Sequence, residues 1–98
     1  MNIKSLTSVL LTTIAAVGMA IPALASPAVL VGRITGSRVN VRAFPSTRAA
    51  APSYGLVGDR VEVIEQRKGD DGYVWYCVQF RSGTIGWVRS DLVRFLSR

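Results

Sequence analysis

The sequence has no histidine and only one cysteine, Cys77. Cys77 therefore lacks the usual imidazole base of a cysteine nucleophile, and metal sites built on histidine are excluded. A single cysteine also excludes a disulfide within the chain. The six carboxylates include one adjacent pair, Asp70 and Asp71, which a glycine flanks on either side. Since aspartate favours turns for backbone reasons, we interpret this pair as a turn and not as a metal or acid–base site.

A phosphate-binding motif is missing as well, because no glycine-rich loop leads from a strand into a helix. These absences remove the common routes to hydrolytic catalysis. We therefore predict that the protein is not an enzyme, with no catalytic residues, no cofactor and no metal.

The first 25 residues have the pattern of an export signal. Lys4 gives a short positive segment, residues 6–21 form an apolar run without charge, and Ala23-Leu24-Ala25 matches the small-x-small cleavage pattern before Ser26. A membrane-anchoring helix is the alternative, but spanning takes about 20 apolar residues and this run is shorter. The protein is therefore expected to be exported, to a periplasm or to the cell wall and exterior.

Basic residues outnumber acidic ones, and the net charge is +6, of which Lys4 contributes one unit. Ten of the twelve basic residues are arginines. A basic surface attracts anionic partners such as acidic wall polymers, lipid headgroups or nucleic acid. Export argues against nucleic acid. The alternative is that the charge only keeps a small domain in solution.

Short strands and turns dominate the rest of the chain. In the strand expected at residues 34–42, two-residue alternation places Val39 and Val41 on one face. In the strand expected at residues 60–65, Val61 and Val63 point inward and the even-numbered residues face outward, where Ile64 is the apolar exception. Such spacing is typical of a small barrel or sandwich. The expected strands are residues 34–42, 60–65, 74–80, 85–88 and 93–96, with one 3₁₀ turn at residues 89–92.

Two stretches are expected to lie outside these strands. Residues 26–33 are interpreted as a short leader, with an extra edge strand at residues 29–31 as the alternative. Residues 43–56 contain prolines and a glycine without helical periodicity, and we interpret them as a long loop. The domain is then expected to span residues 34–98.

Several short motifs occur in order along this domain, and together they resemble the bacterial SH3-like (SH3b) domain family over about residues 34–96. The resemblance implies an all-β fold, a small five-stranded SH3-like barrel that is common in exported envelope proteins. The motifs are V-N-V-R at 39–42, P-S-T at 45–47, G-D-R-V-E-V at 58–63, W-Y-C-V at 75–78 and G-W-V at 86–88.

Two positions and one segment depart from related patterns. Phe44 replaces a glycine that usually precedes P-S-T, so the first loop is expected to follow a different path. Cys77 replaces a lysine at a position that tends to face outward, which leaves open whether the thiol is buried or accessible. Residues 89–92 read R-S-D-L where eukaryotic SH3 domains have P-S-N-Y. Proline-peptide binding is therefore not implied, although Trp75 matches their groove tryptophan.

Alternation in residues 74–80 directs Tyr76, Val78 and Phe80 to the core and leaves Trp75 near the surface, beside the long loop. Aromatic faces and polar groups there could form a shallow groove for sugar or peptide. The alternative is that Trp75 is a packed residue at the rim, and Trp87 is expected to be structural. The candidate ligand-binding residues are Trp75, Tyr54, Tyr73, Asn40 and Arg42.

The resemblance implies a non-catalytic exported module that binds the cell wall, through peptidoglycan peptide or glycan. The alternative function is a protein-interaction or structural module of the envelope, acting by sheet-edge pairing or as a Cys77-linked dimer. The expected partners are a cell-wall polymer or an envelope protein, and no nucleic acid. Contact with a membrane surface through the arginines is a third reading, and a monomer is the expected state.

Overall fold

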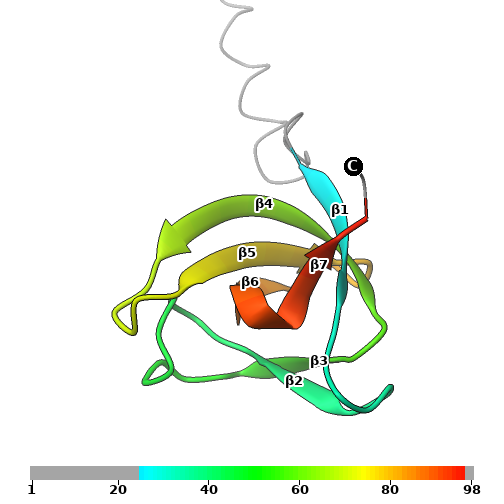
Figure 1. Ribbon diagram of the computed structural model, residues 1–98, viewed down its shortest axis with the longest axis horizontal. Helices are drawn as coiled ribbons and strands as arrows, with labels where there is room; N and C mark the ends of the chain where they lie inside the picture. Colours follow the sequence, from blue (N-terminus) through cyan, green and yellow to red (C-terminus); the bar gives the residue numbers. More distant parts are fainter. Residues whose placement is uncertain (1–24, 97–98) are drawn as a thin grey trace, which may run out of the picture.

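The computed structural model describes residues 25–96, and this part of the chain is built from short antiparallel strands (Figure 1). The predicted export signal, residues 1–25, lies outside the described part of the chain except for Ala25. Within residues 25–96 no helix is long and apolar enough to cross a membrane. The elements are β1 (Ser26–Leu30), β2 (Arg38–Val41), β3 (Ser53–Leu56), β4 (Arg60–Lys68), β5 (Val74–Phe80), β6 (Ile85–Arg89), the 3₁₀ turn η2 (Ser90–Leu92) and β7 (Val93–Phe95).

The strands form a five-stranded sheet in the order β6-β5-β4-β1-β7 and a two-stranded sheet of β2 and β3. In Figure 1 the β2–β3 pair lies across the molecule from β4 and β5. The two sheets are joined at Arg42 and Trp87, whose N–H groups each donate to the other's carbonyl, at 2.9 Å and 2.8 Å. The predicted fold class, all-β with a small SH3-like barrel, is confirmed.

The space between the sheets is filled by small apolar side chains, as the alternation predicted. Val61 and Val63 point inward, and Val78 does so from β5, with Tyr76 and Phe80 packed against it. Burial of such side chains is the main favourable term in folding. The buried core consists of Ala28, Leu30, Val39, Val41, Val61, Val63, Val78, Val88 and Val93.

The second face of β5 is covered too. The pairing register of β4 and β5 shifts by one residue between Val63 and Glu65, which marks a β-bulge at Ile64. Ile64 lies on the face of β4 opposite Val61 and Val63, and the apolar cluster on that face explains the exception in the alternation. Ile64 packs against a second buried cluster of Trp75, Cys77 and Trp87.

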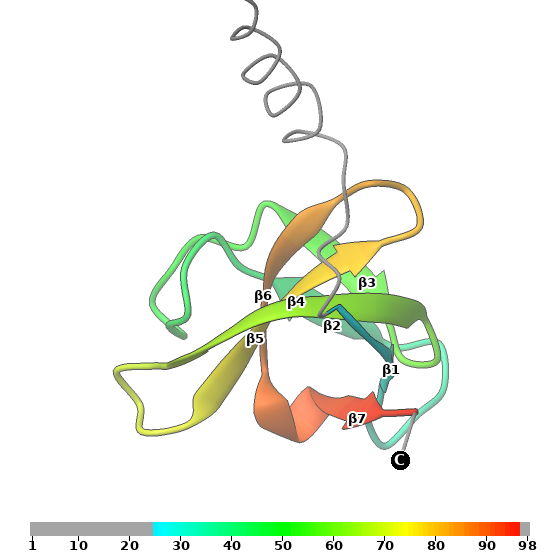
Figure 2. The same ribbon diagram turned by 90° about the horizontal axis from the view of Figure 1, so that it is seen from above.

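The interpretation of residues 26–33 as a leader is wrong for residues 26–30, which form β1. This strand pairs with β4 on one side and β7 on the other, so it is internal to the sheet and not the edge strand considered as the alternative. Ala28 and Leu30 belong to the core, which gives β1 its apolar stripe. Figure 2 shows β1 and β7 side by side.

The boundaries of the first hairpin also differ from the prediction. The strand expected at residues 34–42 begins only at Arg38, after a turn in which Gly36 has a φ of 86°. The loop expected at residues 43–56 ends at Ser53, where β3 begins and pairs with β2. Gly55 signals a loop in the sequence, yet it is needed in β3 because a Cβ there would lie 2.5 Å from the Phe80 ring.

The turns before and after β6 match the prediction. Gly83 takes a φ of 98° in the hairpin between β5 and β6, a conformation that glycine adopts without steric cost. The Gly83 N–H donates to the Phe80 carbonyl at 2.9 Å. The 3₁₀ turn expected after β6 is η2, which directs the chain away from β6 and into β7.

Candidate functional site

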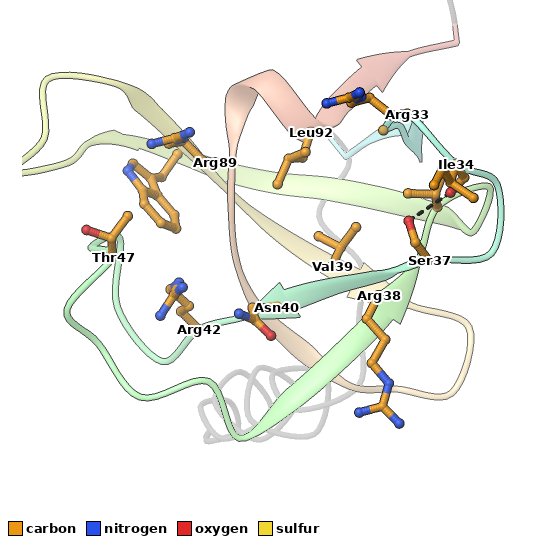
Figure 3. A pocket seen from close by; sticks show the side chains of 13 residues that line it. Arg33, Ile34, Ser37, Arg38, Val39, Asn40, Arg42, Thr47, Arg89 and Leu92 are labelled. Carbon is orange, nitrogen blue, oxygen red and sulfur yellow. Dashed lines mark hydrogen bonds between the residues drawn. The ribbon is translucent and has the colours of Figure 1, made fainter.

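A cleft of about 700 Å³ lies beside β2, between this strand, the β1–β2 connection and η2 (Figure 3). It forms because β6, on its β2 side, pairs with the backbone only at Arg42, just after β2, and the chain then turns into η2 instead of continuing along β2. Clefts with an apolar base and a few polar groups are the usual form of ligand sites. The lining residues include Arg33, Arg38, Asn40, Arg42, Thr47, Trp75, Arg89 and Leu92.

Three of the five candidate residues, Asn40, Arg42 and Trp75, line this cleft. Tyr54 and Tyr73 do not line it, so the structure does not gather all five in one groove. Both tyrosines are about half exposed, at 52% and 45%.

Each tyrosine nevertheless supports an arginine of the cleft. The Arg38 guanidinium lies 4.1 Å from the centroid of the Tyr54 ring, and the Arg89 guanidinium lies 4.1 Å from that of Tyr73. Cation–π contacts of this kind favour one position for a long, flexible side chain. Tyr54 and Tyr73 therefore do not line the cleft themselves but help to position Arg38 and Arg89, which do.

The prediction that Trp75 lies near the surface is wrong, because its side chain is only 2% exposed. Cys77 and Trp87 pack beside it on the second face of β5. The turn after β4 also closes over the indole, since a Cβ on Gly69 would collide with the Trp75 ring and would lie 2.7 Å from the Pro45 carbonyl oxygen. Trp75 thus forms part of the base of the cleft and offers little ring surface to a ligand.

Asp71 holds this region together, a role that the sequence did not reveal. Its Oδ1 accepts hydrogen bonds from Trp75 Nε1 at 3.1 Å and from the Tyr73 N–H at 3.0 Å, while Oδ2 lies 3.5 Å from Arg89 Nη1. Desolvation acts to raise the pKa of Asp71, but the hydrogen bonds from Trp75, Tyr73 and Arg89 outweigh it and lower the pKa below its ordinary value. Turn geometry is present, as predicted, and the carboxylate adds a link from the turn to the cleft.

Arg89 is fixed by two carboxylates. Its Nε and Nη2 donate to Asp91 Oδ1 and Oδ2 at 2.9 Å and 3.1 Å, a bidentate arrangement that guanidinium groups favour. This hydrogen bonding raises the pKa of Arg89 against desolvation, and it lowers the pKa of Asp91. Much of the charge of Arg89 is therefore compensated inside the protein.

The charges of the other three arginines of the cleft are not compensated by a carboxylate of the described residues. Arg42 Nη1 donates to the Ala49 carbonyl at 2.9 Å, which ties the long loop to β2. Arg38 stacks on Tyr54, and Arg33 forms no hydrogen bond or ion pair with a residue in the described part of the chain. No residue that lines the cleft is an aspartate or a glutamate. The lining of the cleft therefore carries a net positive charge.

Arg33, Arg38 and Arg89 were not among the residues expected at the site. Arg33 and Arg38 lie on either side of the turn at Gly36, and Arg89 begins the R-S-D-L segment. The spacing of basic residues around residues 33–42 was the available signal.

Cys77 is buried, with 7% of its surface exposed, which answers the question that the sequence left open. Burial raises the pKa of the thiol, Glu65 raises it further, and Arg67 acts in the opposite direction. A neutral buried thiol is a poor nucleophile. Trp87, expected to be structural, is also buried in this cluster, and the Arg67 guanidinium lies 5.5 Å from its ring centroid.

Comparison with known proteins agrees with the fold. Residues 37–94 match the family model of the bacterial SH3 domain. A curated relative, the serine/threonine-protein kinase D of Synechocystis sp., is 36% identical over 66 residues, which are 66% of this chain. The match covers only 13% of the length of that kinase. No solved structure gives a significant match.

Proposed function

Because the chain belongs to the bacterial SH3 domain family, we infer that it acts as a binding module, and we propose that it is non-catalytic, exported and directed to the cell wall. The kinase similarity covers 13% of that protein, so its name is not carried over to this chain. The proposed ligand is peptidoglycan, recognised through its peptide or its glycan.

The charge of the cleft is the observation that supports this proposal. Four arginines contribute to its lining and no carboxylate does. Cell-wall polymers carry carboxylates and many hydrogen-bond acceptors, and arginine recognises both groups well. Without Lys4 of the predicted export signal, five of the six positive units of net charge remain, and they add a long-range attraction to anionic surfaces.

The test is co-sedimentation of the purified protein with peptidoglycan sacculi. A double variant in the cleft, Arg33→Gln with Arg42→Gln, is compared with a matched variant outside its lining, Arg81→Gln with Arg94→Gln. Both pairs remove the same charge. We expect the cleft variant to bind at least about tenfold more weakly, since loss of a charge-assisted hydrogen bond is worth about 1.5–3 kcal/mol.

The matched variant is expected to bind within about twofold of the unsubstituted protein, apart from a small general effect of charge. An equal loss in both variants would reduce the claim to nonspecific attraction. A protein that does not sediment with sacculi at all would refute the wall-binding function.

A further inference from the structure

β2 is paired on one side only over most of its length. The Ser37 carbonyl accepts from the Val57 N–H on the β3 side, whereas the N–H and carbonyl of Arg42 point to β6 and pair with Trp87. Since backbone groups in a strand alternate in direction, Arg38 and Asn40 point the same way as Arg42, away from β3. Leu56, which lies opposite Arg38, agrees with this pattern, because its N–H donates to Asp59 Oδ2 at 2.9 Å and not to β2.

The position beside these backbone groups is open. If β6 continued along β2 in the register of Arg42 and Trp87, Arg89 would lie opposite Asn40. Instead β6 ends at Arg89, η2 begins, and the cleft takes the place of a strand. Among residues 25–96 no backbone group outside the β2–β3 ladder bonds to the N–H or carbonyl of Arg38 or Asn40.

We propose that the cleft binds an extended, carboxylate-bearing peptide segment that pairs with the free edge of β2 at Arg38 and Asn40. This rests on the proposed function and specifies it, because it selects the peptide part of the wall over the glycan. Figure 3 shows Arg42 and Asn40 along β2, with Arg33, Arg89 and Leu92 across the cleft.

Backbone spacing is the reason for a peptide. Residues two apart in a strand repeat their donor and acceptor at about 6.6–6.8 Å, and an extended peptide presents complementary groups at the same interval. The wall glycan carries its N–H and carbonyl groups on pendant acetamides and not in a continuous backbone that could pair with a strand. The reason for carboxylates is complementarity with the arginines of the lining, of which Arg33 has no counter-ion among the described residues.

Amide hydrogen exchange measured by nuclear magnetic resonance tests the pairing directly. The probe is a short N-acetylated peptide of alternating alanine and glutamate with a free carboxyl terminus, added to the purified protein. At saturation we expect exchange at Arg38 and Asn40 to slow at least about tenfold, since their N–H groups become bonded. Val39 and Val41, already bonded to β3, are expected to change by less than about twofold.

Two altered peptides serve as matched controls, and neither depends on a protein variant that folds poorly. N-methylation of the peptide residues whose N–H groups face β2 is expected to abolish the protection, whereas N-methylation of the intervening residues is expected to retain it. Replacing the glutamates by glutamines and the terminal carboxylate by an amide is expected to weaken binding at least about tenfold. Protection that is equal for Arg38 and Val39, or indifferent to the position of methylation, would overturn the proposal.

The outcomes separate this proposal from the wall-binding function. Sedimentation with sacculi without edge protection by the peptide would keep the function and reject the strand pairing, leaving the glycan as ligand. Edge protection without sedimentation would keep the strand pairing and reject the wall as the source of the peptide. An envelope protein with an acidic extended segment would then be the partner.

Discussion

At the scale of single residues, the carboxylate of Asp71 joins three parts of the molecule: the turn before β5, the indole of Trp75 and the guanidinium of Arg89. The aspartate pair at residues 70 and 71 was expected to serve the turn alone. Its neighbour Asp70 contacts neither Trp75 nor Arg89 and instead joins the turn to the loop after β2, by accepting a hydrogen bond from Ser46 Oγ at 3.0 Å. The two carboxylates are adjacent in sequence but differ in function, and this makes them a natural pair for comparison.

The first prediction concerns pH. The pKa of Asp71 is lowered in the folded state from 3.8, so its ionised form stabilises the fold above that value. This contribution is lost as the pH falls from 3.8 through the lower folded pKa, because the unfolded chain then binds the proton more readily. Urea unfolding midpoints are expected to fall less steeply in this acid range for Asp71→Asn than for the unsubstituted protein, with Asp70→Asn as the control. Equal slopes in all three proteins would refute the role of Asp71.

Trp75 gives the second prediction. Replacing it with alanine removes a buried indole from the second cluster and is expected to reduce the free energy of unfolding by about 3–5 kcal/mol. Tyr73→Ala, which removes a half-exposed ring, is expected to cost less than about 1 kcal/mol. Chemical denaturation measures both values. Similar values for both variants would contradict the buried position of Trp75.

This prediction also bears on binding experiments. A loss of ligand binding in Trp75→Ala would report unfolding or local collapse as readily as loss of contact. Substitutions at Arg33 and Arg42 are therefore the better test of the cleft.

The third prediction concerns Cys77. Burial and a raised thiol pKa both slow its reaction with soluble disulfide reagents. At neutral pH we expect labelling of the folded protein at least about a hundredfold slower than labelling in denaturant, as for a thiol exposed only by opening of the structure. Rapid labelling without denaturant, or a reducible dimer on electrophoresis, would favour the alternative of a Cys77-linked dimer.

At the scale of elements, the contact between β2 and β6 keeps the two sheets together. Gly86 makes this contact close, because a Cβ there would collide with Val41 Cγ1 and would lie 3.1 Å from the Arg42 carbonyl oxygen. The fourth prediction is that Gly86→Ala reduces the free energy of unfolding by about 1–3 kcal/mol. Ile85→Ala, an exposed position on the same strand, is expected to cost less than about 1 kcal/mol in the same denaturation experiment. Equal losses would mean that the junction is not closely packed.

The sequence predicted the elements whose signals are local. Alternation identified β4 and β5, and the glycine at residue 83 identified the hairpin turn. β1 and β3 were missed because their assignment depends on distant partners: β1 is a strand because β4 and β7 lie on either side of it. β3 contains Gly55, which local rules assign to a loop, although packing against Phe80 requires it in a strand.

The site was predicted only in part for a similar reason. Asn40 and Arg42 were expected as polar groups of a groove beside Trp75, and the cleft does include them. The burial of Trp75 could not be read from alternation, since that pattern says which face of β5 a residue takes and not what covers the face. Arg89 lines the cleft because the chain turns into η2 directly after it. The direction of that turn relative to β2 depends on the packing of the whole fold, which a local pattern does not encode.

At the scale of the whole molecule, β1 bears on the predicted export signal. Cleavage after Ala25 would leave Ser26 and Pro27 in place, and these residues pair with Val63 and Glu62. The fifth prediction is that mass spectrometry of the protein recovered from a bacterial envelope gives a mature chain that begins at Ser26. A product that retains residues 1–25 would favour the membrane-anchoring alternative.

The pairing of β1 with β7 also determines how this domain can be combined with other sequences. The Leu96 N–H donates to the Pro27 carbonyl at 3.0 Å, so the chain enters and leaves the barrel at one place. A unit of this shape can be spliced into a surface loop of a host protein without separating the residues that flank the insertion. The cleft beside β2 would remain uncovered in such a fusion, since Pro27 and Leu96 are not among its lining residues. Grafting residues 26–96 into an unrelated carrier would thus transfer the arginine-lined cleft as a portable unit.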